Sequence, residues 1–113
     1  MAKERIDSRE QGKRAERECA AIWTDLGFPA RRGQQFSGIE GKDIVGPAGF
    51  HIECKHCERM QLYKWMEQAT DDADEDEVPV VCHRKNREEF LITMRLKDFP
   101  ASCVKGFLGL ADD

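Results

Sequence analysis

The segment at residues 41–55 (GKDIVGPAGFHIECK) constrains the fold more than any other part of the chain. Two short β-prone runs flank a Gly/Pro-rich turn, and this pattern predicts two strands joined as a hairpin. Successive side chains of a strand point to opposite faces, so Glu53 and Lys55 share one face of the second strand. The other face is apolar and is predicted to be buried; it carries Phe50, Ile52 and Cys54.

The charged residues of this hairpin suit chemistry on a phosphodiester. Asp43 and Glu53 are carboxylates that can bind a divalent metal, and the ammonium of Lys55 can face a phosphate. Asp43 can share a metal with Glu53 only if an odd-length turn or a bulge places it on the same face, for instance directly opposite Glu53. A solvated sheet edge with a surface ion pair is an equally good explanation of these residues taken alone.

The length of 113 residues predicts a single domain over residues 1–113, with flanking segments at 1–7 and 100–113. No apolar run approaches the length of a membrane span, and the N-terminus lacks the apolar region of a signal peptide. An odd count of five cysteines favours reduced thiols. We therefore expect a cytoplasmic protein with no membrane partner.

The charge is unevenly distributed along the chain. The formal net charge is −4, but six acidic residues lie within residues 71–77, so the rest of the chain is net basic. A local basic face can attract phosphates despite an acidic total, although each of these charges can also be an ordinary solvated one. The acidic segment either keeps nucleic acid from the wrong face of the protein or only keeps the chain soluble.

Periodicity and turn signals predict the element order α-β-β-β-α-β-β. The first helix has an apolar stripe at helical spacing, a capping-box pattern at Ser8 and Gln11, and Gly27 as its stop. We expect helices at 8–26 and 59–73, strands at 28–32, around Asp43, around Glu53, at 78–82 and at 90–94, a loop at 34–42, and a helical turn at 96–99. The fold class is α/β, a mixed five-stranded sheet flanked by helices.

Four pieces of sequence, in order along the chain, resemble the PD-(D/E)XK nuclease superfamily, and most closely the archaeal-type Holliday junction resolvases and their phage relatives. Residues 12–18 (GKRAERE) are similar to the Gly-x-x-x-Glu-Arg-Glu helix of that family. The other pieces are Arg31-Arg32 followed by Ser37-Gly38, Asp43 with Glu53-Cys54-Lys55, and Pro79-Val80-Val81 with Arg84-Lys85. The resemblance covers roughly residues 11–96. It departs from the family at Lys42, where proline is usual, and at Cys82-His83, where a supporting cation is expected.

The resemblance implies a restriction-endonuclease-like core and a role for each matched residue. Asp43 and Glu53 are expected to hold Mg²⁺, for which Mn²⁺ substitutes, with the main-chain carbonyl of Cys54 as a further ligand. Glu16 supports the metal site from the first helix. Lys55 positions or deprotonates the attacking water and stabilises charge on the phosphate. Gln68, on the second helix, orients the water, unless it is simply a helix-surface residue.

The same resemblance implies DNA as the partner and a homodimer as the assembly, because cutting two opposed strands requires two active sites. The expected phosphate contacts are Arg5, Arg9, Lys13, Arg14, Arg17, Arg31, Arg32, Ser37, Lys42, Arg84 and Lys85. Apolar candidates for the dimer interface, which core packing would equally explain, are Phe99, Val104, Phe107, Leu108, Leu110, Trp65 and Met60.

The sequence thus predicts a Mg²⁺-dependent endodeoxyribonuclease that resolves four-way DNA junctions by paired nicks. It would act in DNA recombination and repair, in the cytoplasm of a bacterium or a phage-infected cell, with no small-molecule substrate. A related nuclease that acts on flaps, other branched DNA or single strands is an alternative.

A non-catalytic module that binds branched DNA, stabilised by zinc, is the alternative of another class. The candidate zinc ligands are His51, Cys54, His56, Cys57, Cys82 and His83. A single Cys54-x-x-Cys57 pair is a weak zinc signal, and Cys54 is expected to face the core. His51 lies on the same strand face as Glu53, so it can line the catalytic cleft instead.

Overall fold

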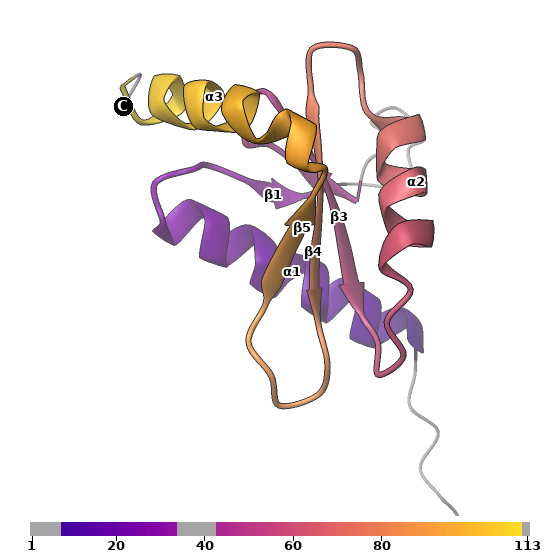
Figure 1. Ribbon diagram of the computed structural model, residues 1–113. Coiled ribbons are helices and arrows are strands. Elements are labelled where there is room, and N and C mark those ends of the chain that lie inside the picture. The colour runs from indigo at the N-terminus through magenta and orange to yellow at the C-terminus, as the bar shows by residue number, and fades with distance from the viewer. Residues whose placement is uncertain (1–7, 34–42, 112–113) are drawn as a thin grey trace, which may run out of the picture.

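Helices flank two small β-sheets in the computed structural model, which describes residues 8–33 and 43–111 (Figure 1). The elements are α1 (Ser8–Asp25), β1 (Arg31–Arg32), β2 (Ile44–Val45), β3 (Phe50–His56), α2 (Leu62–Asp72), β4 (Val78–Arg84), β5 (Leu91–Met94), the short 3₁₀ helix η2 (Leu96–Asp98) and α3 (Phe99–Ala111). The predicted order α-β-β-β-α-β-β is confirmed. The last helix, α3, occupies the tail for which the sequence made no assignment beyond a helical turn.

The five described strands form two sheets instead of one. β3 pairs in parallel with β4, and β4 pairs antiparallel with β5. β2 pairs antiparallel with β1, with Arg32 opposite Ile44. The expected hairpin between the Asp43 strand and the Glu53 strand is therefore wrong. The α/β class, with sheets flanked by helices, is confirmed.

The turn after β2 explains why no hairpin forms. Gly46 and Gly49 both have positive φ values, +88° and +87°, in the region that favours glycine. A Cβ atom at Gly46 would lie 2.5 Å from the carbonyl oxygen of Pro29, so the chain passes there in close contact with the segment before β1. β2 consequently stays beside β1, and β3 is left to pair with β4.

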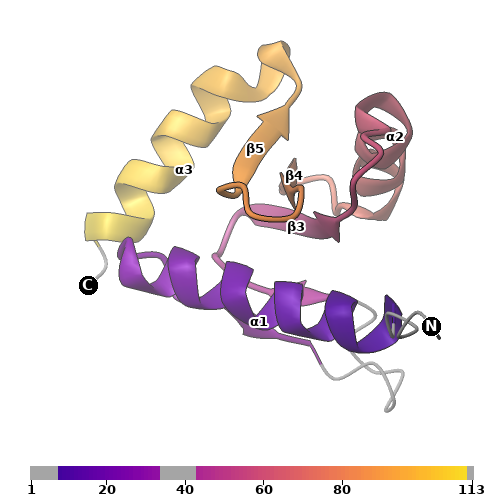
Figure 2. The same ribbon diagram turned by 90° about the horizontal axis from the view of Figure 1, so that it is seen from below.

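The two faces of the three-stranded sheet carry separate apolar clusters. On the α1 side, Ile52 and Val80 are almost fully buried together with Cys19 of the helix. On the α2 side, Val81 packs against Trp65, Met66 and Ala69. Figure 2 shows α1 and α2 on different sides of this sheet. A residue of β3 or β4 therefore faces either α1 or α2 according to its place in the alternation.

Two expectations about apolar residues are corrected by this packing. Trp65 is only 6% exposed and belongs to the α2 cluster, and Met60 is half-buried against that cluster, so these two residues are core rather than interface. By contrast, α3 leaves several large apolar side chains exposed: Phe99, Val104, Phe107 and Leu108. In the described part of the chain, no helix combines the length and the apolar character needed to cross a membrane.

Candidate functional site

The face of β3 that is turned toward α2 carries the charged residues of the strand. Glu53 is paired with Val81 and Lys55 with His83 in the parallel register. Val81 packs into the α2 cluster, and paired residues of neighbouring strands point to the same side. Glu53 and Lys55 therefore share the α2 face, as the alternation of the sequence predicts.

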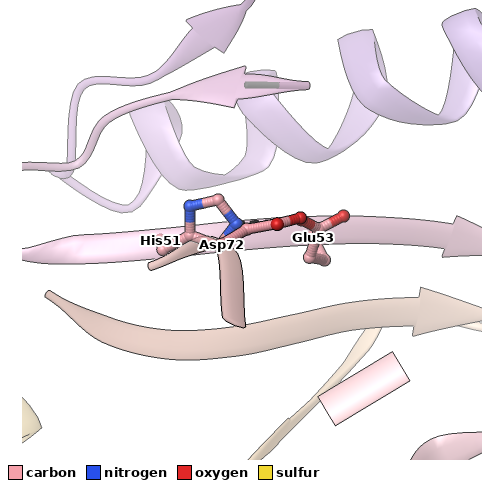
Figure 3. Close-up of side chains that lie close together, drawn as sticks. All are labelled: His51, Glu53 and Asp72. Atoms are coloured by element: carbon pink, nitrogen blue, oxygen red, sulfur yellow. Dashed lines mark hydrogen bonds and ion pairs between the residues drawn. The ribbon is translucent and has the colours of Figure 1, made fainter. Parts of the chain in front are cut away.

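Glu53 is buried beside a histidine and lies close to an exposed second carboxylate. His51 Nε2 is 2.8 Å from Glu53 Oε1, and the two residues are 2% and 5% exposed. Asp72, at the C-terminal end of α2, brings its carboxylate to the same place (Figure 3). One potential ligand atom from each of the three residues lies within 4.8 Å of the others. Such a cluster of carboxylate oxygens and an imidazole nitrogen fits a divalent cation.

Lys55 is hydrogen-bonded to Gln68, the residue that the family resemblance assigned to orienting the water. Its Nζ donates a hydrogen bond of 3.2 Å to Gln68 Oε1 on α2. Gln68 and Asp72 are four residues apart on the helix, about 6 Å along its axis. Glu53 and Lys55 are two residues apart on the strand, about 6.6 Å. These matched spacings let α2 place Gln68 at Lys55 and Asp72 at Glu53.

Glu16 occupies a different environment, between α1 and β1. Its side chain is buried, and its Oε1 accepts a hydrogen bond of 3.4 Å from Arg32 Nε. Burial raises the pKa of Glu16 above its ordinary value, the negative charge of Asp43 raises it further, and Arg32 opposes both effects. Asp43 therefore lies close enough to Glu16 for their charges to interact.

The structure thus brings the predicted site residues together as two sets. Glu16 and Asp43 approach each other on one side, and Glu53, Lys55 and Gln68 lie along β3 and α2. In residues 8–33 and 43–111, the cluster of three possible metal ligands contains Glu53 but neither Glu16 nor Asp43.

Sequence reasoning did not assign Asp72 to the site. Its acidic neighbours made it look like one charge in a solvated run. The usable signal was its spacing of four residues from Gln68 on one helix face. His51 was considered as a zinc ligand or as a residue that lines the cleft, and its place two residues before Glu53 was the corresponding signal on the strand.

The predicted DNA contacts differ in their exposure. Arg32, Arg84 and Lys13 are half-buried and form ion pairs: Arg32 with Glu16, Arg84 with Glu18 at 3.1 Å, and Lys13 with Glu10 at 3.7 Å. The remaining described ones are exposed, namely Arg9, Arg14, Arg17, Arg31 and Lys85. Arg5, Ser37 and Lys42 lie outside the described residues.

Cys19 and Cys82 are buried as neutral thiols. Hydrogen bonding to Cys54 raises the pKa of Cys19, and hydrogen bonding to Cys19 raises that of Cys82; burial raises both further. A thiol that resists ionisation is a poor metal ligand. Within the described part of the chain, the cluster of possible metal ligands contains His51 but no cysteine, so the geometry does not place the Cys54-x-x-Cys57 pair at a metal site.

An α/β fold with Glu53-x-Lys55 on strand β3, beside a cluster that fits a divalent cation, is the arrangement expected of a PD-(D/E)XK nuclease. The family described as "Phage putative PDDEXK endonuclease" matches residues 7–106, most of the chain. The protein belongs to this family of phage PDDEXK endonucleases and is accordingly a nuclease.

Comparison with solved structures gives a further similarity. The structure of Hjc, a Holliday junction resolvase from the archaeal hyperthermophile Archaeoglobus fulgidus, is 20% identical in sequence and superposes with a TM-score of 0.49. The match covers 72% of this chain and 73% of Hjc. No curated protein matches the sequence.

Proposed function

We propose that this nuclease is a divalent-metal-dependent endodeoxyribonuclease that resolves four-way DNA junctions as a homodimer. The observation that carries the proposal is the side-by-side placement of Glu53 and Lys55 on β3, in a chain whose residues 7–106 match the PDDEXK endonucleases. We propose the four-way junction as substrate because pieces of the sequence, from the GKRAERE helix to Arg84-Lys85, resemble those of junction resolvases.

The metal is proposed to be Mg²⁺, with Mn²⁺ able to substitute. Glu53 would hold it, and the motif resemblance adds Asp43, the carbonyl of Cys54 and support from Glu16. When bound, the cation supplies Lewis-acid chemistry at the phosphodiester. The buried position of Glu53 fits this role, because a buried carboxylate needs a compensating positive charge or hydrogen bonds.

Lys55 is proposed to stabilise the negative charge that grows on the phosphate oxygens during hydrolysis. Its ammonium is only partly exposed and is fixed by the hydrogen bond to Gln68. Gln68 is then a positioning residue, because it acts through Lys55. An ammonium held in place before the substrate arrives requires little reorganisation during the reaction.

DNA is proposed to bind through the exposed cations of the first helix and of β1, with Lys85 beyond β4. Such phosphate contacts would make binding weaken steeply as salt increases. Two active sites are needed to nick two opposed strands, so we propose a homodimer. The exposed apolar side chains of α3 are the candidate interface. The sequence resemblance to archaeal-type junction resolvases and their phage relatives supports a cytoplasmic role in DNA recombination and repair.

The proposal is tested by incubating the purified protein with four-way junction, flap, linear duplex and single-stranded DNA in the presence of Mg²⁺. We expect paired nicks in opposed strands of the junction, with 5′-phosphate ends, and a dimer by light scattering. Asp43→Asn should abolish cleavage, whereas Asp25→Asn, an exposed position at the end of α1, should not. If junctions are bound but never cut, the proposed nuclease activity is contradicted and a non-catalytic module that binds branched DNA is favoured. Preferential cutting of flaps or single strands would contradict the junction as substrate.

A further inference from the structure

We infer that His51, Glu53 and Asp72 form a metal site that binds a divalent transition-metal ion more tightly than Mg²⁺, the ion proposed above to support cleavage. Two of these ligands, His51 and Asp72, lie outside the nuclease motif. The role of the ion in DNA cleavage rests on the proposed function, but its binding does not. The inference depends on the spacing, the charge and the chemistry of the three side chains.

The spacing of the three groups fits ligands of a single ion. Ligand atoms at about 2.0–2.2 Å from an ion are about 3 Å apart when adjacent and at most about 4.4 Å apart when opposite. His51 Nε2 and Glu53 Oε1 are 2.8 Å apart, close to the value for adjacent ligands. All three ligand atoms lie within 4.8 Å of one another, so a small side-chain adjustment would bring them onto one ion.

The local charge favours a cation. Glu53 and Asp72 contribute two carboxylates, and neither forms an ion pair with lysine or arginine within the described residues. Asp72 also belongs to the last turn of α2, which contains no basic residue. The C-terminal end of a helix carries a partial negative charge, so it disfavours an aspartate and favours a cation. A bound ion would relieve all of these unfavourable interactions at once.

The histidine decides which cation fits. Mg²⁺ prefers oxygen ligands in near-ideal octahedral geometry, whereas imidazole nitrogen favours transition-metal ions. His51 is 2% exposed; one ring nitrogen faces Glu53, and the other, Nδ1, is buried without a hydrogen-bond partner. A buried imidazole that serves only as a structural hydrogen-bonding group would normally have both nitrogens paired. The donor set therefore points to an ion such as Mn²⁺.

The test measures metal binding by the full-length protein without DNA. Chelator-treated protein is titrated with MnCl₂ while free Mn²⁺ is followed by electron paramagnetic resonance, and MgCl₂ is then added as competitor. We expect one strong Mn²⁺ site per chain, bound at least tenfold more tightly than Mg²⁺. Asp72→Asn should weaken Mn²⁺ binding at least tenfold. Asp71→Asn, the exposed neighbour outside the cluster, should leave it unchanged.

His51→Gln should reduce the preference for Mn²⁺ over Mg²⁺ and leave total carboxylate charge unaltered. If this buried substitution unfolds the protein, as circular dichroism would show, the exposed Asp72 still gives a decisive result. The inferred site is contradicted if Asp72→Asn binds Mn²⁺ as tightly as the wild-type protein does. It is also contradicted if the wild-type protein binds Mn²⁺ and Mg²⁺ equally tightly. Mn²⁺ binding that depends on Asp72 supports the site even if no DNA substrate is cut, a result that would contradict only the proposed function.

Discussion

Replacing Arg32 with methionine removes the cation that accompanies the buried carboxylate of Glu16. The two groups are 3.4 Å apart, and their side chains are 28% and 10% exposed. Opposite charges at that distance attract by about 5 kcal/mol at an effective dielectric constant of about 20. Solvent screening on the arginine side and the cost of desolvating both groups offset most of this attraction. We expect a loss of about 1–2 kcal/mol in the free energy of unfolding at neutral pH.

The loss of stability in Arg32→Met is expected to depend on pH. Burial raises the pKa of Glu16 above 4.5, and Arg32 opposes that rise. Without Arg32, the folded state carries an unpaired buried carboxylate at neutral pH. That penalty should shrink as the pH falls toward 4.5, because the carboxyl becomes protonated and no longer needs a partner.

The assay is urea denaturation of chelator-treated protein at a series of pH values between 7 and 4.5. Arg14→Met, at an exposed position on the same helix as Glu16, serves as the control and should change stability by less than about 0.5 kcal/mol. The reasoning is refuted if Arg32→Met is no less stable than Arg14→Met at pH 7. It is also refuted if the deficit stays constant as the pH is lowered.

Three other predictions concern the α2 side of the sheet. Lys55→Met should reduce the rate of single-turnover DNA cleavage by about a hundredfold or more, because the group that stabilises charge on the phosphate is lost. Lys55→Arg should retain more activity than Lys55→Met. Lys64→Met, a control on α2, should leave the cleavage rate unchanged. Gln68→Ala should lower the cleavage rate more modestly, by about threefold to tenfold, without changing the thermal midpoint; an unchanged rate would mean that Gln68 does not position Lys55. Burial lowers the pKa of His83, whose ring is hydrogen-bonded to Thr93. The free energy of unfolding should therefore fall as the pH drops below about 6.5. In urea titrations, His83→Gln should make the free energy of unfolding depend less on pH in this range.

Local patterns were sufficient to predict much of the site. The alternation of the strand placed Glu53 and Lys55 on one face, and the apolar stripe of the first helix indicated which face of α1 is buried. Both are short-range regularities, set by the two-residue and 3.6-residue periods of the backbone. Gln68 was named from the family resemblance and not from a local pattern, and the structure joins it to Lys55 by a hydrogen bond.

Long-range pairing was not predictable in the same way. The residues around the Gly/Pro turn are compatible with a hairpin, but the close approach of Gly46 to Pro29 leaves β2 beside β1. α3 was missed because its apolar residues follow no stripe that a core would require, and several of them remain exposed.

By itself, the sequence determined which side chains share a face within each element, and through its ordered motifs it indicated the nuclease family. Only the tertiary structure decided which elements meet. The parallel pairing of β3 with β4 requires a crossover, and α2 supplies it by returning along β3. That return brings Asp72 to Glu53 and His51, and Gln68 to Lys55. No local periodicity encodes such contacts, because they depend on how the helix folds back and packs against the strand that precedes it.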